Sequence, residues 1–193
     1  MADDPPPAVP PADPHDVDSI DGIVNALYDS VSFAEGERPT WERFRSLFQP
    51  SAVMVRVNPR VTREVAARSG SWGRPATSET GADEGGASPH SDDQPEALRV
   101  SSIDDYIART TAAIEGGALR GFTERELTRR TEVFADVAQV FSTYERSAEA
   151  EGVRRGVNSM AMVKDGERWW IVSLSWTDET DDGPLPSRYQ PRS

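Results

Sequence analysis

The 193-residue sequence has no cysteine, two histidines and a single lysine, Lys164. The absence of cysteine excludes disulfides, thiolate chemistry and cysteine-ligated zinc or iron–sulfur sites. With one lysine and scattered arginines, the chain lacks the clustered positive charge that binds phosphate backbones, so we expect no nucleic-acid partner. The N-terminal residues do not resemble a signal peptide, and no apolar run is long enough to span a membrane. These absences predict a cytoplasmic protein without metal or cofactor and without membrane contact.

The net charge of −12 is concentrated in three segments. Residues 1–18 hold five aspartates and no base, residues 62–97 hold seven acidic residues and three arginines, and residues 177–193 hold four acidic residues and two arginines. Such composition is typical of a solvated chain rather than of an acidic binding surface. We therefore predict disordered tails at 1–17 and 180–193, a flexible acidic insertion at 62–97, and one folded domain over 18–179.

Apolar periodicity predicts the elements of this domain. Helices are expected from 20 to about 36, at 41–48 and from 103 to about 115, because apolar residues recur every three or four positions in these segments. Strands are expected at 52–57, 122–133, 137–148, 154–164 and 168–177, where β-branched and aromatic residues form short runs. Four consecutive strands with short turns form an antiparallel meander. The pattern predicts an α+β fold in which a curved antiparallel sheet wraps as a cone on three helical segments.

The last strand is predicted to be apolar on both faces, if its residues alternate strictly. One face carries Trp170, Val172, Leu174 and Trp176, and the other carries Trp169, Ile171 and Ser173. Helices can cover only one face, so we expect a second copy of the chain to cover the other. The second set is the predicted dimer face.

Four sequence strings resemble the nuclear transport factor 2-like (SnoaL-like) superfamily, in a bacterial branch whose members are uncharacterised. They are WERFRSLF at 41–48, VFSTYE at 140–145, RGVNS at 155–159 and RWWIV at 168–172. The resemblance covers residues 18–58 and 98–179 and implies the cone fold with an interior pocket, sometimes called a cystatin-like α+β barrel. Because the superfamily contains isomerases, dehydratases, cyclases, epoxide hydrolases, adaptors and binding proteins, it does not imply one activity.

The catalytic pattern of the superfamily is incomplete in this sequence. In relatives of the ketosteroid isomerase type, a tyrosine on the first helix and an aspartate on the first strand supply the oxyanion donor and the base. Tyr28 matches the first position, but Arg56 stands at the second, and a guanidinium cannot abstract a proton. Other relatives use a histidine, whereas His15 and His90 lie in segments predicted to be disordered.

Glu126 is then the remaining catalytic candidate. If its side chain points into the cone, Arg56, Arg129 or Arg155 could pair with it and the pair could orient water or a polar ligand. The alternative is a solvated cross-strand ladder or a buried structural ion pair.

The predicted ligand pocket combines polar tips with aromatic surface at the open end of the cone. Its residues are Tyr28, Arg56, Tyr106, Glu126, Tyr144, Asn158 and Trp176. The favoured function is a homodimer that binds a small, mostly apolar organic ligand there, without catalysis, since no histidine or aspartate occupies the usual base positions. One alternative is a lyase, isomerase or hydrolase that uses a glutamate, an arginine and a tyrosine without a cofactor. Another is a protein-interaction adaptor that uses the acidic tails and the loop around Trp72.

Overall fold

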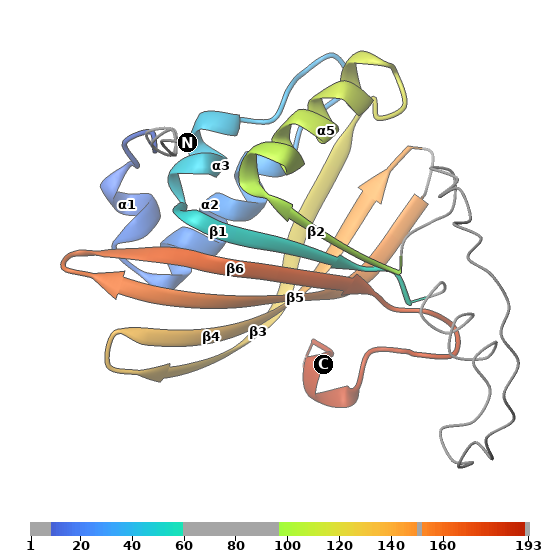
Figure 1. Cartoon of the computed structure of the whole chain (residues 1–193). Helices are drawn as coiled ribbons and strands as arrows, with labels where there is room; N and C mark the ends of the chain where they lie inside the picture. Colours follow the sequence, from blue (N-terminus) through green and yellow to red (C-terminus); the bar gives the residue numbers. More distant parts are fainter. Residues whose placement is uncertain (1–8, 60–96, 150–151, 192–193) are drawn as a thin grey trace, which may run out of the picture.

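The computed structural model describes residues 9–59, 97–149 and 152–191, which form helices packed on one face of a curved six-stranded sheet (Figure 1). The predicted insertion 62–97, with Trp72 and His90, lies outside the described residues apart from Ala97. No helix in the described ranges is long and apolar enough to cross a membrane.

The helices in the described residues are α1 (Pro14–Val17), α2 (Ile20–Val31), α3 (Trp41–Ser46) and α5 (Ile103–Glu115). Three of these four helices begin where the sequence indicated, whereas α1 was not predicted and α2 ends about five residues before its predicted end. The Ser19 hydroxyl caps α2 by accepting a bond from the amide of Gly22 at 3.0 Å. Ser102 and Asp105 form a reciprocal capping box at the start of α5. These caps satisfy amides that have no partner within the first turn of a helix.

The strands confirm the α+β prediction. They are β1 (Phe48–Val57), β2 (Leu98–Ser102), β3 (Phe122–Phe134), β4 (Val137–Ala148), β5 (Gly152–Asp165) and β6 (Arg168–Asp178). The sheet order is β2-β1-β6-β5-β4-β3, and every neighbouring pair is antiparallel except β1 and β6, which run parallel. The short edge strand β2 was not predicted, and β1 begins four residues before its predicted start.

Two β-bulges interrupt the alternation of the long strands. In β3 the register shifts between Glu126 and Thr128, so Leu127 is the extra residue. In β6, Ile171 pairs with Met162 and Ser173 pairs with Ala161, so Val172 is the extra residue. A bulge bends its strand and reverses which later residues face the core. Both bulges therefore curve the sheet and change the faces that strict alternation predicts.

The predicted dimer face is wrong for two of its three residues. Trp169 and Ile171 are buried in the core with the helices, at 7% and 0% exposure, and beyond the bulge Leu174 joins the same face. Ser173 alone of the predicted set lies on the outer face, opposite the helices. The core is thus a single apolar layer between the sheet and the helices.

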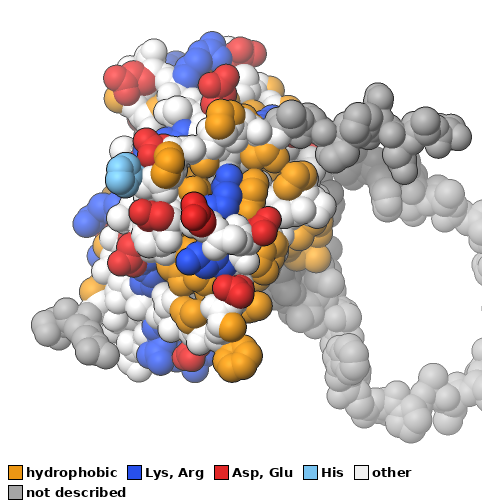
Figure 2. Space-filling view, turned by 90° about the vertical axis from the view of Figure 1, so that its left-hand side faces the viewer, with side chains coloured by type: hydrophobic (Ala, Val, Ile, Leu, Met, Phe, Trp, Pro, Cys, Tyr) orange, Lys and Arg blue, Asp and Glu red, His pale blue; other side chains and the backbone are white. Residues whose placement is uncertain are grey.

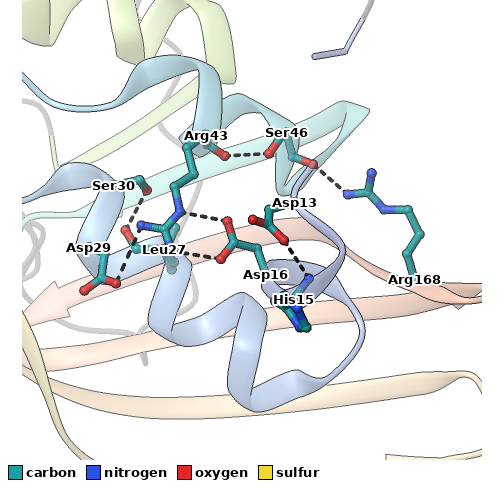
Figure 3. A network of polar contacts seen from close by, with 9 residues as sticks. All are labelled: Asp13, His15, Asp16, Leu27, Asp29, Ser30, Arg43, Ser46 and Arg168. Carbon is teal, nitrogen blue, oxygen red and sulfur yellow. Dashed lines mark hydrogen bonds and ion pairs between the residues drawn. The ribbon is translucent and has the colours of Figure 1, made fainter. Parts of the chain in front are cut away.

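The prediction of a disordered tail at 1–17 is wrong for Pro14–Val17. Val17 is buried, and the guanidinium of Arg43 on α3 donates two hydrogen bonds to Asp16, at 2.7 and 2.8 Å (Figure 3). Arg43 also lies 3.6 Å from Asp29 on α2. The hydrogen bond from Arg43 holds the pKa of Asp16 below its usual value against the effect of burial. This bidentate pair joins the first three helices.

The predicted disorder of the C-terminal tail 180–193 is also wrong over its described part. The segment crosses below the sheet in Figure 1, on the face opposite the helices, and includes a short 3-10 helix at Ser187–Tyr189. The Tyr189 ring lies 5.7 Å from that of Phe141, and the Thr143 hydroxyl donates to the Tyr189 carbonyl at 2.7 Å. Part of the outer face is therefore covered by the chain itself.

The end of the molecule formed by α1 and the β3–β4 and β5–β6 turns carries charges of both signs among hydrophobic side chains (Figure 2). His15 on α1 is exposed, and Phe134 at the β3–β4 turn is 86% exposed. No single sign of charge dominates this face.

The bulge at Val172 can be tested by paired truncations in β6. We expect Ile171→Ala to lower the free energy of unfolding by about 3 kcal/mol, because Ile171 is fully buried. Val172→Ala should cost less than about 1 kcal/mol, since the Val172 side chain is only partly buried. Urea denaturation followed by tryptophan fluorescence measures both. If the two variants lose the same free energy of unfolding, the bulge at Val172 in β6 is contradicted.

Candidate functional site

A cavity of about 210 Å³ lies between the helices and the concave face of the sheet. Its apolar wall comes from α2, α3 and the inner faces of four strands. The wall includes Leu27, Phe44, Met54, Phe122, Leu174 and Trp176. Arg56 and Arg109 both line the cavity and are exposed, so they mark its mouth. The cavity is therefore an apolar chamber with a charged opening.

Aromatic rings fix one side of this chamber. The Tyr106 ring on α5 stacks on Phe44 of α3 with 5.6 Å between centroids. Trp41 and Trp176 each contact Tyr106 edge-on at 6.1 Å. Burial, followed by the charge of Glu124, raises the pKa of Tyr106 to about 12, so its hydroxyl remains protonated at neutral pH. These contacts make a rigid aromatic wall with a neutral hydroxyl.

Glu124 on β3 is the acidic group of the cavity. Its Oε1 accepts a hydrogen bond from Nδ2 of Asn158 on β5 at 3.0 Å. Burial raises the pKa of the Glu124 carboxyl to about 7, although the Asn158 hydrogen bond and the charge of Arg146 act in the opposite direction. A carboxyl with this pKa can give or take a proton near neutral pH.

Asn158 connects Glu124 to a buried polar network behind the cavity. Its Nδ2 also donates to the Tyr28 hydroxyl at 3.2 Å, and that hydroxyl lies 2.6 Å from the Ser142 hydroxyl. Ser142 donates its proton to Glu126, which leaves Tyr28 as the donor to Ser142. Burial raises the pKa of Tyr28, and the charge of Glu124 adds to the effect. The network therefore holds Asn158, and through it Glu124, in one orientation.

Glu126 is bound within this network and not in the cavity. Its Oε2 lies 3.1 Å from the guanidinium of Arg129, which in turn lies 3.1 Å from Asp21 on α2. In a regular strand, residues three apart face opposite sides, so the bulge at Leu127 is what allows Glu126 and Arg129 to pair. The pair is the structural ion pair that the sequence left open as an alternative.

A second carboxylate, Asp178 on β6, is neutralised beside the cavity. Arg146 donates to both its oxygens, at 3.1 and 2.7 Å, and the Tyr144 hydroxyl donates at 2.7 Å. Burial opposes ionisation, but these hydrogen bonds hold the pKa of Asp178 below its usual value. Tyr144 reaches Asp178 across Gly156 of β5, where an added Cβ would lie 2.3 Å from the Tyr144 hydroxyl. Gly156 therefore permits this contact.

The structure brings together part of the predicted pocket. Arg56, Tyr106, Asn158 and Trp176 line the cavity. The other three predicted residues lie behind it in the polar networks just described, and they are Tyr28, Glu126 and Tyr144.

The charged cavity residues that sequence reasoning missed are Glu124, Arg99, Arg109 and Arg146. Glu124 had a detectable signal, because it shares a strand face with Glu126. The sequence does not say which of the two lies nearer the open end of the cone. In the structure Glu124 lies nearer the open end. Its cross-strand partner is Arg146, which lines the cavity, whereas the partner of Glu126 is Tyr144, which does not.

The described residues hold no group of three or more His, Asp or Glu side chains arranged to bind a metal ion. A bound organic molecule would meet polar groups that include Glu124, Asn158, the Tyr106 hydroxyl and the arginines at the mouth.

Comparisons with solved structures give the following likenesses. A nuclear transport factor 2-like superfamily protein from Salmonella enterica is 13% identical, with a TM-score of 0.49, over 85% of this chain and 87% of that one. A nuclear transport factor 2-like protein of unknown function from Shewanella baltica is 11% identical, with a TM-score of 0.44, over 82% and 92%. A Kribbella flavida protein is 15% identical, with a TM-score of 0.37, and the match spans 44% of this chain and 63% of that one.

No family model and no curated protein sequence matches the chain. The described residues form an α+β fold with a curved six-stranded sheet. Its elements follow the order helices, two strands, a further helix and then four antiparallel strands. Apart from the added edge strand β2, this is the order that the sequence resemblance to the nuclear transport factor 2-like superfamily implies. A shared fold does not assign a reaction in this superfamily.

The raised pKa of Glu124 predicts how stability depends on pH. The folded chain holds the Glu124 proton up to about pH 7, whereas an unperturbed glutamate loses it near pH 4.5. This contribution to stability is present below pH 4.5 and is lost as the pH rises through 7. We therefore expect Glu124→Gln to be more stable than the wild type above pH 7, by on the order of 2 kcal/mol, and to lose that advantage near pH 4.

Urea denaturation between pH 4 and 8 measures this difference. The matched control is Glu145→Gln, because hydrogen bonds from Arg125 and Arg155 lower the pKa of Glu145 on the outer face. The control should gain no stability above pH 7. If the difference in the free energy of unfolding between Glu124→Gln and the wild type stays constant over this pH range, the pKa of Glu124 is not raised in the folded chain.

Proposed function

We propose that the chain is a binding domain whose cavity holds a small, mostly apolar organic molecule against Glu124. The observation that carries the proposal is an apolar cavity of about 210 Å³ in which Glu124 is the one carboxyl among the described lining residues. A cavity of about 150 Å³ is enough for benzene, so this one has room for a ring with a short substituent.

The lining supports a ligand with one polar group. Aromatic and aliphatic side chains form most of the wall, and Tyr106, Asn158 and Glu124 supply hydrogen-bonding atoms. Below pH 7 the Glu124 carboxyl is protonated and can donate to a carbonyl or hydroxyl oxygen of the ligand. Such an arrangement of apolar walls with few oriented polar groups is typical of small-molecule sites.

Binding of 3-phenylpropan-1-ol tests this proposal. We expect a dissociation constant on the order of 1 mM or tighter, from about 0.4 kcal/mol for each non-hydrogen atom. Leu119→Trp should abolish binding, because Leu119 lines the cavity and the larger ring would fill it. Titration calorimetry and tryptophan fluorescence measure the affinity.

The control for this experiment replaces a leucine by tryptophan outside the cavity. Leu98 on β2 is 56% exposed on the outer face, so Leu98→Trp should bind the alcohol as the wild type does. If the wild type binds nothing, or if Leu119→Trp binds as well as Leu98→Trp, the cavity is not the binding site.

The raised pKa of Glu124 favours a second function, namely proton transfer as in an isomerase or lyase. Glu126 cannot have this role on a ligand in the cavity, because it is bonded to Ser142 and paired with Arg129 behind the wall. Glu124 faces the cavity, and its pKa of about 7 suits a general acid–base at neutral pH. The neutral hydroxyl of Tyr106 could polarise a carbonyl.

Exchange of α-hydrogens for deuterium in phenylacetone tests the enzymatic function. In D2O the wild type should accelerate exchange, with a rate that rises as Glu124 ionises through about pH 7. Glu124→Gln should reduce the rate at least 100-fold, which is the usual contribution of a general base. Proton NMR follows the exchange. Acceleration that survives in Glu124→Gln would rule out this role and leave the binding proposal intact.

The homodimer remains a proposal, on a different surface from the predicted one. The outer face carries an exposed apolar patch on β1 and β2, with Val53, Leu98 and Val100 at 42%, 56% and 61% exposure. A second copy would cover this patch, and light scattering would show it. The adaptor hypothesis depends on the Trp72 loop, which lies outside the described residues, and remains a prediction.

A further inference from the structure

Three arginines gather at the mouth of the cavity, in a chain whose net charge is −12. We call Arg56, Arg99 and Arg109 the mouth arginines. Arg56 lies on β1, Arg99 on β2 and Arg109 on α5, so three separate elements bring them to one opening.

The Arg109 guanidinium also lies 3.5 Å from the Ser101 hydroxyl and 3.5 Å from the Asp105 carbonyl. Arg146 lines the cavity too, with its guanidinium bonded to Asp178.

The pairing of the strands places two of these arginines side by side. Arg56 and Arg99 are direct cross-strand partners on the inner face of the antiparallel pair β1–β2. A bound anion would be attracted by both charges, whereas a wholly apolar ligand would not.

Two of the mouth arginines also lie near the aromatic wall of the cavity. Arg56 and Arg109 are both close enough to the Tyr106 hydroxyl to influence it electrostatically. Tyr106 belongs to the aromatic wall, so positive charge lies directly beside the apolar chamber. A ligand with its apolar body against this wall would place a terminal group among the guanidinium groups.

We propose that the cavity takes an organic monocarboxylate, whose apolar body fills the chamber and whose carboxylate is held by Arg56 and Arg109. This inference rests on the proposed function of the cavity. Guanidinium groups bind carboxylates through paired, charge-assisted hydrogen bonds, and Arg56 and Arg109 are accessible for them. A cavity of about 210 Å³ limits the body to roughly one ring and a short linker.

A matched pair of probes tests the inference. We expect 3-phenylpropionate to bind the full chain at least tenfold more tightly than 3-phenylpropan-1-ol in titration calorimetry at pH 6 and low salt. At this pH the probe is ionised and Glu124 is largely neutral. Arg56→Gln and Arg109→Gln should each weaken binding of the acid about three- to tenfold and change binding of the alcohol less than twofold.

Control variants separate a specific contact from a general effect of charge. Arg38→Gln removes the same charge from an exposed pair with Glu115 that does not line the cavity, and it should leave both affinities unchanged. Arg56→Lys should retain part of the preference for the acid. If the two probes bind equally, the inference is overturned and the proposed function stands. If neither probe binds, the proposed function fails as well.

Discussion

The curvature of the sheet is the constraint on which the cavity, the buried ion pair and the covered faces all depend. A regular six-stranded sheet would present its inner side chains along a gently twisted surface. The extra residues Leu127 in β3 and Val172 in β6 bend two of these strands toward the helices. The helices then fill one end of the concave side, and the other end remains open as a chamber.

The same bulges explain what the sequence could and could not predict. Periodicity located α5 and the four long strands to within two residues, because each carries a continuous apolar pattern. It also located the start of α2, whose predicted end near Gly36 lies about five residues beyond the observed end at Val31. Periodicity gave the wrong sheet face for residues that follow a bulge in the same strand. Strict alternation separates Trp169 and Ile171 from Leu174, whereas the extra residue Val172 puts all three in the core. A bulge depends on pairing with another strand, which composition along one strand does not record.

The predictions of disorder for the two terminal segments failed for a related reason. Their composition is that of disordered chain, and the argument from composition cannot include a specific long-range contact. Asp16 is ordered because Arg43, 27 residues later, binds both of its oxygens (Figure 3). At the C-terminus, Tyr189 packs on Phe141 and accepts a hydrogen bond from Thr143. Long-range contacts of this kind, with the burial of Val17 and Leu185, hold both acidic segments against the domain.

The three carboxylates around the chamber differ in chemistry because they differ in hydrogen-bond partner. Glu126 is paired with Arg129, and Asp178 is held by Arg146 and Tyr144, so both are structural anions. Glu124 receives a hydrogen bond from the neutral amide of Asn158, and burial therefore decides its pKa. The chamber thus has a neutral or weakly acidic group on its inner wall and cations at its opening. A ligand with one apolar and one anionic end has a single favourable direction of entry, with its anionic end at the arginines of the opening. In this orientation its apolar end would lie beside Glu124, whose carboxyl can exchange a proton near pH 7.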